Sequence, residues 1–434
     1  MKFPRRSLLS SVLSGLAGAA AAPGLAQAAA KAAGKFDLQA AADKAAAGDG
    51  VLRLPAGSFT GLGIRIAKPL RIEGVPGLTR IVCQPGGANI VIADAAHVSL
   101  SGLTLVGDTG PVSDKNGAAM LMAGGCDGLV IENCGFESSA VTALALENCS
   151  GRVSNSSFTG IDATAIFALD SRGLTITGNT LRDIGNNGIQ VWRSAIGEDG
   201  TIVSGNRIAN VAAKNGGTGQ NGNGINVYRA GNVLVANNRV SDCAFSAIRN
   251  NSGSHCQVLG NSISRTGEVA IYCEFSFEGA VVANNLIEDV AFGISITNFN
   301  EGGRLAVVAN NVIRKVTGGR SLAATNGIAI AAEADTDVTG NVIEDARDTG
   351  IHLGWRAYAR NLSASNNLIR NCGRGIAFSV SDGAGPVLIS GNRISGAQQA
   401  AIQGMDGSDP VTGDLGKPAA AVPVGHMISG NLVT

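Results

Sequence analysis

The chain has 434 residues with 33 basic and 33 acidic side chains, so its formal net charge at neutral pH is zero. This balance argues against a basic surface for nucleic acid, and we expect no nucleic-acid partner. Apolar residues make up 45% of the chain, enough for a large core, whereas 61 glycines and an aromatic content of 4% favour a fold with many turns.

Residues 1–28 are predicted to be an export signal. Arg5 and Arg6 precede an apolar stretch, and Ala26-Gln27-Ala28 forms a small-residue cleavage site ending at Ala28. The adjacent arginines resemble a twin-arginine signal, which predicts contact with the twin-arginine translocon and a periplasmic or secreted location. An ordinary secretory signal is the alternative. After the signal is removed, no later segment is long and apolar enough to predict a membrane span.

Residues 29–36 follow as a flexible leader, and residues 37–47 are predicted to form a capping helix. Asp37 is a suitable N-cap, and the alanine-rich segment from Leu38 ends at Gly48. A helix at this point would cover the open end of a stack of strands, which otherwise exposes unpaired backbone groups. Short strands are then expected within 51–59 and 70–74.

One motif recurs through the rest of the chain, first as Thr175-Ile-Thr-Gly-Asn-Thr-Leu181. A small or branched apolar residue lies three positions before each central asparagine and another lies two positions after it. The central asparagines are Asn179, Asn206, Asn238, Asn261, Asn285, Asn311, Asn341, Asn367, Asn392 and Asn431. Spacing of this kind predicts a solenoid. The Gly or Asn before each central asparagine permits a sharp turn, and each asparagine can bond its equivalent one coil away.

A second strand with the pattern Gly/Ala-Ile-x-apolar follows each motif, as in Gly188-Ile-Gln-Val191 and Gly224-Ile-Asn-Val227. Such coils bury their apolar faces by stacking about 4.8 Å apart. The repeats from Leu103 to Asn431 predict about a dozen coils, which together would extend roughly 60 Å. We therefore expect an all-β parallel helix domain over residues 37–434.

Three segments interrupt the pattern. Insertions at 212–223 and 318–326 both precede a Gly-Ile strand, so they should project from one corner of the stack, where insertions often mark the working face. The segment 405–424 is expected to be an interrupting loop before the last coil. Most of the eight cysteines occupy apolar repeat positions and are predicted to be buried fillers. Cys126 and Cys149 fall at similar points of adjacent coils and form the one plausible disulfide pair.

The opening Val51-Leu-Arg-Leu-Pro-Ala-Gly57 and Leu70-Arg-Ile-Glu-Gly74, together with the Gly-Asn-x-Ile repeats, resemble the pectate-lyase-like right-handed parallel β-helix superfamily. The twin-arginine start makes the chain most similar to exported repeat proteins of that superfamily with no assigned activity. The resemblance implies a single-stranded right-handed parallel β-helix. It leaves function open, because this fold serves lyases, hydrolases, epimerases and binding proteins.

Alternation along the Gly-Ile strand predicts which side chains point outward to solvent. The first outward row is Phe167, Gln190, Asn226, Arg249, Tyr272, Ser295, Ala329, His352, Ala377 and Gln403. A second row, two positions further on, is Trp192, Tyr228, Asn251, Glu274 and Thr297, and Arg193 and Arg229 follow the first two of these. Aromatic rings beside arginine and amide groups suit sugar rings and uronate carboxylates. An ordinary solvated face is the alternative.

These rows predict a groove for an extended polysaccharide. The substrate-binding candidates are Gln190, Trp192, Arg193, Asn226, Tyr228, Arg229 and Asn251, and the catalytic candidates are Arg249, Tyr272, Glu274 and His352. We expect Trp192, Arg229, Arg249, Tyr272 and Glu274 to line one trough.

Processing of a uronate by β-elimination would use Tyr272 or His352 as base and Arg249 or Arg229 to neutralise the carboxylate. Glycoside hydrolysis is disfavoured, because Glu274 has a potential carboxyl partner only in Glu301, while Asp170 lies four coils away. A non-catalytic periplasmic scaffold or binding module is the main alternative. A copper-site maturation role is a weaker one. The sequence contains no cofactor motif and predicts no metal site.

Overall fold

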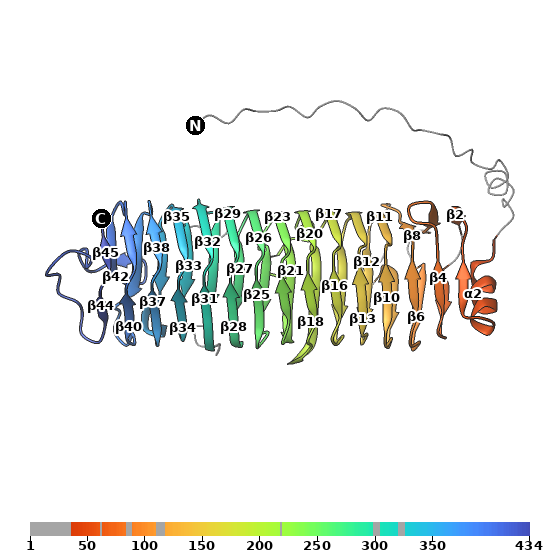
Figure 1. Ribbon diagram of the computed structural model, residues 1–434, viewed down its shortest axis with the longest axis horizontal. Helices are drawn as coiled ribbons and strands as arrows, with labels where there is room; N and C mark the ends of the chain where they lie inside the picture. Colours follow the sequence, from red (N-terminus) through yellow and green to blue (C-terminus); the bar gives the residue numbers. More distant parts are fainter. Residues whose placement is uncertain are drawn as a thin grey trace, which may run out of the picture.

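The computed structural model describes residues 36–60, 63–83, 89–109, 118–217, 219–297, 304–319 and 326–434. Within these ranges the chain winds into an elongated stack of coils made of three sheets with fifteen strands each (Figure 1). Up to β42 the strands of each sheet follow one another at every third position in the chain, and neighbours are parallel except for the pair β42 and β43. The predicted parallel β-helix is therefore confirmed.

Each coil contributes one strand to each sheet, in the order A, B, C. Sheet A contains β1 (Val51–Arg53), β4 (Arg71–Glu73), β7 (Ser99–Ser101), β10 (Leu129–Glu132), β13 (Gly151–Ser154), β16 (Thr175–Thr177), β19 (Ile202–Ser204), β22 (Leu234–Ala236), β25 (Cys256–Leu259), β28 (Glu278–Ala283), β31 (Arg304–Ala309), β34 (Thr336–Thr339), β37 (Leu362–Ser365), β40 (Val387–Ser390) and β44 (Met427–Ser429).

In each repeat that has the asparagine motif, the sheet B strand begins directly after the turn that holds the asparagine. Sheet B contains β2 (Gly57–Thr60), β5 (Thr79–Val82), β8 (Leu103–Val106), β11 (Gly135–Ser139), β14 (Ser157–Ile161), β17 (Thr180–Ile184), β20 (Arg207–Val211), β23 (Arg239–Cys243), β26 (Ser262–Thr266), β29 (Leu286–Val290), β32 (Val312–Val316), β35 (Val342–Ala346), β38 (Leu368–Arg370), β41 (Arg393–Ser395) and β45 (Leu432–Val433). Two of its strands precede Leu103, which agrees with the dozen or so coils expected from there on.

Sheet C carries the Gly-Ile strands. It contains β3 (Ile64–Ile66), β6 (Ile90–Ala93), β9 (Ala119–Gly124), β12 (Thr142–Glu147), β15 (Thr164–Leu169), β18 (Asn187–Glu198), β21 (Asn223–Gly231), β24 (Ile248–Asn251), β27 (Val269–Glu274), β30 (Phe292–Thr297), β33 (Ile328–Ala332), β36 (Thr349–Leu353), β39 (Arg374–Ser379), β42 (Ala400–Asp406) and β43 (Asp409–Pro410). The last strand, β43, is antiparallel to β42, and a short 3₁₀ helix, η2 (Arg356–Tyr358), follows β36.

The helix α2 (Leu38–Ala47) covers the N-terminal end of the stack, as its composition predicts (Figure 1). The Asp37 side chain caps it by accepting a hydrogen bond from Ala40 N at 2.9 Å. Leu38 and Ala42 are buried, and the Gln39 side chain bonds the backbone N and O of Arg65 in β3 at 2.8 and 3.1 Å. The helix thus pairs polar backbone groups that the first coil would leave open.

The recurring asparagines form a continuous buried ladder at the turn between sheets A and B. Asn206 Oδ1 accepts hydrogen bonds from both N and Nδ2 of Asn179 at 3.0 Å, and Asn179 Nδ2 also donates to Val153 O at 3.0 Å. The same bonds repeat through Asn392 and Asn431. The residue before each asparagine has φ between 55° and 67°, for example Gly178 at 67° and Asn310 at 55°, which explains why Gly or Asn stands there.

The interior is a column of aliphatic side chains from all three sheets. The apolar residues before the asparagines stack in register from Ile176 through Val203 and Val235 onward and are buried. All eight cysteines are buried free thiols, so Cys126 and Cys149 are not bridged. Their sulfurs instead donate to Gly124 O and Ala123 O at 3.3 and 3.4 Å. Cys243 and Cys372 are buried fillers, as predicted.

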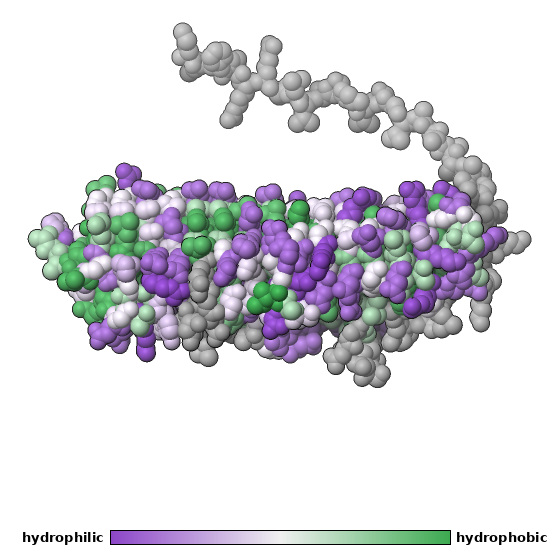
Figure 2. Space-filling model, turned by 90° about the horizontal axis from the view of Figure 1, so that it is seen from below, coloured by the Kyte–Doolittle hydropathy of each residue, from purple (hydrophilic) through white to green (hydrophobic). Residues whose placement is uncertain are grey.

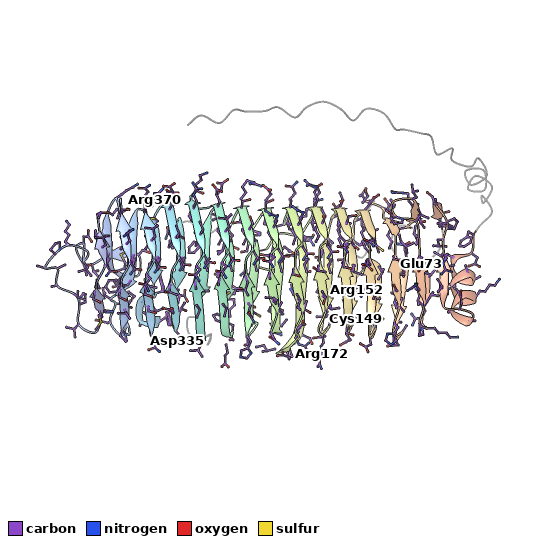
Figure 3. The ribbon with its side chains drawn as sticks, viewed as in Figure 1. Glu73, Cys149, Arg152, Arg172, Asp335 and Arg370 are labelled. Atoms are coloured by element: carbon purple, nitrogen blue, oxygen red, sulfur yellow. The ribbon has the colours of Figure 1, made fainter. Side chains whose placement is uncertain are left out.

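Charged side chains lie on the sheet faces, as Glu73 in β4 and Arg152 in β13 do, and also at the corners of the stack (Figure 3). Arg172 and Asp335, which occupy turns from sheet C to sheet A, lie along the same corner, whereas Arg370 at the end of β38 lies along the opposite one (Figure 3). The face seen from below is mixed, with hydrophilic residues dominating near the N-terminal end and short hydrophobic rows nearer the C-terminal end (Figure 2). In the described part of the chain no helix is long and apolar enough to cross a bilayer.

Candidate functional site

The outer face of sheet C brings together two rows of functional side chains. Gln190, Asn226, Arg249 and Tyr272 occupy equivalent positions of β18, β21, β24 and β27. Trp192, Tyr228, Asn251 and Glu274 form the second row on the same strands. The register of both rows in this region is as the repeat pattern predicts.

A pocket of about 500 Å³ lies over these strands. Its walls are formed by Trp192, Gly219, Gln220, Asn226, Tyr228, Arg249, Asn251 and Phe275, which we call the trough. Of the five residues expected to share one hollow, Trp192 and Arg249 line it. Arg229, Tyr272 and Glu274 lie next to it and contact its lining residues.

Aromatic rings form one wall of the trough. The Trp192 and Tyr228 ring centroids are 5.5 Å apart at 61°, and Phe167 meets the other side of Trp192 at 5.6 Å. Trp192 Nε1 is buried and has no hydrogen-bond partner. A buried indole N–H normally has a hydrogen-bond acceptor. The Trp192 N–H therefore lacks an expected acceptor, and it lies beside a cavity of ligand size.

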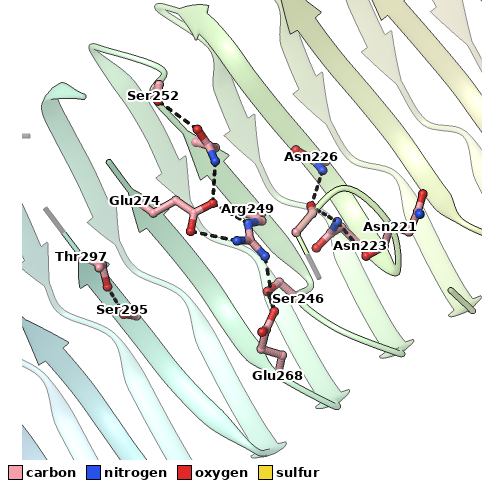
Figure 4. A network of polar contacts seen from close by, with 12 residues as sticks. Asn221, Asn223, Asn226, Ser246, Arg249, Ser252, Glu268, Glu274, Ser295 and Thr297 are labelled. Atoms are coloured by element: carbon pink, nitrogen blue, oxygen red, sulfur yellow. Dashed lines mark hydrogen bonds and ion pairs between the residues drawn. The ribbon is translucent and has the colours of Figure 1, made fainter. Parts of the chain in front are cut away.

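Arg249 forms the floor of the trough and lies between two carboxylates (Figure 4). Its Nε and Nη2 bond Glu274 Oε1 and Oε2 at 2.7 and 2.8 Å, and its Nη1 is 3.5 Å from Glu268 Oε2. All three side chains are at most 11% exposed. Asn251 Nδ2 also donates to Glu274 Oε1, and Ser246 Oγ donates to Glu268. The guanidinium is therefore already held by a bidentate partner.

The described residues of the insertion 212–223 fold back over this floor, so Asn226 and Arg249 are buried and not solvent-exposed as alternation predicted. Gly219 O accepts hydrogen bonds from Asn226 Nδ2 at 3.0 Å and from Asn223 Nδ2 at 2.9 Å (Figure 4). Gly219 has φ of 101°, and a Cβ there would lie 3.0 Å from Arg249 Nη2, so glycine is required. Gln190, Asn226 and Arg249 are 6%, 3% and 9% exposed.

Tyr272 lies beneath the guanidinium group, with Arg249 Cζ 4.9 Å from its ring centre. Burial, reinforced by the Glu274 carboxylate, raises the pKa of Tyr272 to about 12. The phenol therefore keeps its proton at neutral pH and is suited to donate a hydrogen bond rather than to act as a resting base.

The remaining binding candidates make structural contacts. Gln190 Oε1 accepts from Thr164 Oγ1 at 3.0 Å, and Arg193 Nη1 lies 3.5 Å from Ser171 O and 4.0 Å from Asp199 Oδ2. Arg229 stacks on the Tyr228 ring at 4.7 Å and donates to Ser194 O at 2.8 Å. Glu301, the potential carboxyl partner of Glu274, lies outside the described residues, as do the signal residues Arg5, Arg6 and Ala28.

His352 lies in a different pocket, four coils beyond Arg249 along the first row. The prediction that Ala329 lies in the first row between Ser295 and His352 is wrong. The strand pairing places Ala331 at that position. Ala329 is fully buried. Both Gly327-Ile328 and Ala329-Ile330 match the strand pattern, and the second pair is the one in register. His352 therefore does not contact Tyr272, Arg249 or Glu274.

Sequence alone did not identify Gly219, Gln220, Glu268 or Phe275 as part of this site. Gly219 and Gln220 lie in the insertion. The sequence shows that the insertion is rich in glycine, but it does not show where the insertion runs over the sheet. Among the described residues, no group of three or more His, Cys, Asp or Glu side chains is arranged to hold a metal ion.

Solved structures with the same fold are distant in sequence. An alginate lyase in complex with a trisaccharide is 13% identical, with a TM-score of 0.51 over 80% of this chain and 79% of the other. The surface adhesin PfbA of Streptococcus pneumoniae is 15% identical, with a TM-score of 0.46 and coverage of 87% and 92%. An α-1,3-glucanase catalytic unit from Streptomyces thermodiastaticus is 14% identical, with a TM-score of 0.45 and coverage of 90% and 64%. At these identities the likeness concerns the fold alone.

No curated protein sequence matches the chain significantly. The family described as "Right handed beta helix region" matches residues 88–217, 142–313 and 300–414, which overlap to span most of the chain. The sequence repeats, the three stacked sheets and this match agree, and the protein belongs to the right-handed beta helix region family.

Proposed function

We propose that this protein binds an extended glycan along the outer face of sheet C, with one sugar ring held in the trough. The observation that carries the proposal is the pairing of the Trp192 and Tyr228 rings, at 5.5 Å, with the unsatisfied Trp192 Nε1 beside a pocket of about 500 Å³. Apolar ring faces take up the C–H faces of sugars, and the Asn226, Asn251 and Gln220 amides supply groups that match hydroxyls.

Binding without chemistry is the function that this geometry supports best. Arg249 is bonded bidentately to Glu274, so it is not free to neutralise a uronate carboxylate, and Arg229 donates to a backbone carbonyl. Tyr272, with its pKa raised to about 12, is protonated at neutral pH. A binding module therefore needs no rearrangement of these groups, whereas a lyase would need Arg249 to leave Glu274.

Tyr228→Ala tests the binding proposal directly. We expect the mature protein to retain particular oligosaccharides from an immobilised panel of neutral and acidic glycans, and calorimetry on the best of them to show a three- to tenfold loss of affinity in the variant, roughly the energy of one ring contact. Val281→Ala, on the outer face of sheet A, is the matched control and should leave affinity unchanged. Equal affinities for Tyr228→Ala and the parent protein would contradict the proposal.

β-Elimination at a uronate is the second candidate function, with Tyr272 beside Arg249 as its supporting feature. In that reaction the base removes the proton at C5 and the glycosidic oxygen leaves from C4, which creates a double bond in the product. Incubation with alginate and pectate, followed by ultraviolet absorbance of unsaturated sugars, tests it. An increase that disappears in Tyr272→Phe would support the lyase, and no increase on either polymer would remove it.

We also propose that the chain reaches the periplasm or the exterior through the twin-arginine translocon. Arg5 and Arg6 ahead of an apolar stretch support this. Replacing both by lysine should leave precursor in the cytoplasm, while unchanged export would point to an ordinary secretory signal.

A further inference from the structure

A second pocket, of about 410 Å³, opens on the same face of sheet C around His352 and Trp355. Its walls are formed by β33, β36, β39 and β42 and by residues next to them in the chain. The lining residues include Asp348, Arg374, Gln399, Met405 and Ser408. Along the first row, His352 lies four coils from Arg249. At about 4.8 Å a coil, the two positions are roughly 19 Å apart. The second pocket is therefore a site separate from the trough.

An aromatic ring and an unsatisfied polar atom converge in this pocket, as they do in the trough. His352 and Trp355 have ring centroids 6.3 Å apart, inclined at 46°. His352 Nε2 is buried and has no hydrogen-bond partner. Burial is also the main reason why the pKa of His352 is lowered to about 4, so the imidazole is neutral at physiological pH. A neutral imidazole has one donor and one acceptor nitrogen.

The charges of the pocket disfavour an anionic ligand. Arg374 Nη1 bonds Asp348 Oδ1 at 2.7 Å, and its Nε bonds Gln403 Oε1 at 2.8 Å, so its charge is already neutralised. Among the described lining residues, the one arginine is thus paired with a carboxylate and the histidine is neutral, so this wall offers an anionic ligand no uncompensated cation.

We propose that this pocket is a second glycan site that takes an uncharged sugar unit, with its ring on Trp355 and a hydroxyl group on His352 Nε2. A hydroxyl both donates and accepts, so it satisfies Nε2 in either tautomer of the ring. The inference rests on the proposed function for the ligand class, but it adds a second contact point and a preference for neutral units. Ser295 and Ala331 are the first-row residues between Tyr272 and His352.

The protein has two tryptophans, Trp192 and Trp355, one in each pocket. Trp192→Phe therefore leaves Trp355 as the sole fluorescent reporter of the second pocket, and Trp355→Phe leaves Trp192 as the reporter of the trough. The probes are cellohexaose, maltohexaose, laminarihexaose and mannohexaose, together with hexagalacturonate and its carboxyl-reduced form, which differ only at C6, a carboxylate in one and a hydroxymethyl group in the other.

In Trp192→Phe protein we expect at least one neutral hexasaccharide to change Trp355 emission saturably. The carboxyl-reduced hexamer should bind about tenfold more tightly than hexagalacturonate, since the described wall offers no uncompensated cation to offset the desolvation of a uronate carboxylate. His352→Ala should weaken the neutral probe three- to tenfold, and His352→Gln, which keeps a polar group, should weaken it less.

The outcomes separate the two proposals. If Trp192 responds in Trp355→Phe protein while Trp355 responds to no neutral probe in Trp192→Phe protein, the second site is wrong and the trough stands. Equal or tighter binding of hexagalacturonate at Trp355 overturns the preference for neutral units. If neither reporter responds to any probe, both the second site and the proposed function fail.

Discussion

At the scale of single residues, burial decides the chemistry of the sheet C face. Arg249, Glu268 and Glu274 are polar side chains that alternation alone directs outward or into turns, yet each side chain is at most 11% exposed. Arg249 contacts both carboxylates, and Asn251 and Ser246 donate further hydrogen bonds to Glu274 and Glu268. The group therefore positions the floor of the trough and is not available to titrate freely against a ligand.

Arg249→Met should lower the free energy of unfolding by about 3–5 kcal/mol, because it leaves the buried Glu274 carboxylate without its bidentate cation. Thermal unfolding followed by circular dichroism measures this change. Arg229→Met, which removes a half-buried arginine bonded to a backbone carbonyl on the same face, is the control and should cost about 1 kcal/mol. Adding Glu274→Gln to Arg249→Met should recover part of the loss, and a full loss in the double variant would contradict the charge argument.

His352 predicts a specific pH dependence of stability. Its pKa is lowered to about 4 in the folded protein from an ordinary value of 6.5, so between these values the unfolded chain binds the extra proton. Stability should therefore fall as the pH decreases from about 6.5 to about 4 and should not change further through this group below that. Asp348, Glu333 and Arg374 are the charged groups around it.

His352→Gln removes this titration and should flatten that part of the curve of melting temperature against pH. His97→Gln is the control, because it alters a histidine outside both pockets and should keep the slope. A parent and a His352→Gln variant with parallel curves would show that the imidazole is not held neutral by burial.

At the scale of elements, the repeat determined what sequence could predict. The asparagine ladder, the stacked aliphatic column and the capping helix were all predictable, because each depends on local turn geometry and a fixed apolar period. The prediction that Ala329 belongs to the first row was wrong because two pairs, Gly327-Ile328 and Ala329-Ile330, match the same strand pattern. The path of the described part of the 212–223 insertion depends on contacts with Asn226 and Arg249, which lie outside the insertion. A local sequence pattern therefore could not predict it.

Asn238→Ala should destabilise the fold by about 3 kcal/mol. It leaves Val203 O, Asn206 N and Asn206 Nδ2 without their partners inside the stack. Asn431→Ala removes equivalent bonds at the C-terminal end of the ladder, where water can replace them, and should cost about 1 kcal/mol. Chemical denaturation compares the two, and equal losses would mean that the ladder adds nothing beyond its turns.

At the scale of the whole molecule, the two pockets described above open on the same face of the stack. Sheet C carries both pockets, roughly 19 Å apart by coil count, so a chain-like ligand running parallel to the long axis fits the arrangement better than a compact one. Sequence showed that aromatic and arginine residues gather here. It did not show two separate pockets, because their walls come from loops and from charge pairs between coils.

The N-terminal end is closed by α2, and its removal should expose the edges of the first coil. A variant lacking residues 37–48 should associate with itself, because unpaired strand edges recruit one another. Light scattering of the purified variant measures this, with Asp37→Ala as a milder comparison that weakens the cap by about 1 kcal/mol without removing it. A truncated protein that stays monomeric and melts like the parent would show that the helix does not protect the end.

The central claim is that the outer face of sheet C holds a glycan. The most direct measurement is a crystal structure of the mature protein with the oligosaccharide that it retains best from the glycan panel. We predict a sugar ring stacked against Trp192 and Tyr228, with an oxygen accepting the free Trp192 Nε1–H. Density for the sugar on sheet A, on sheet B or at an end of the stack, with the trough holding solvent, would contradict the claim.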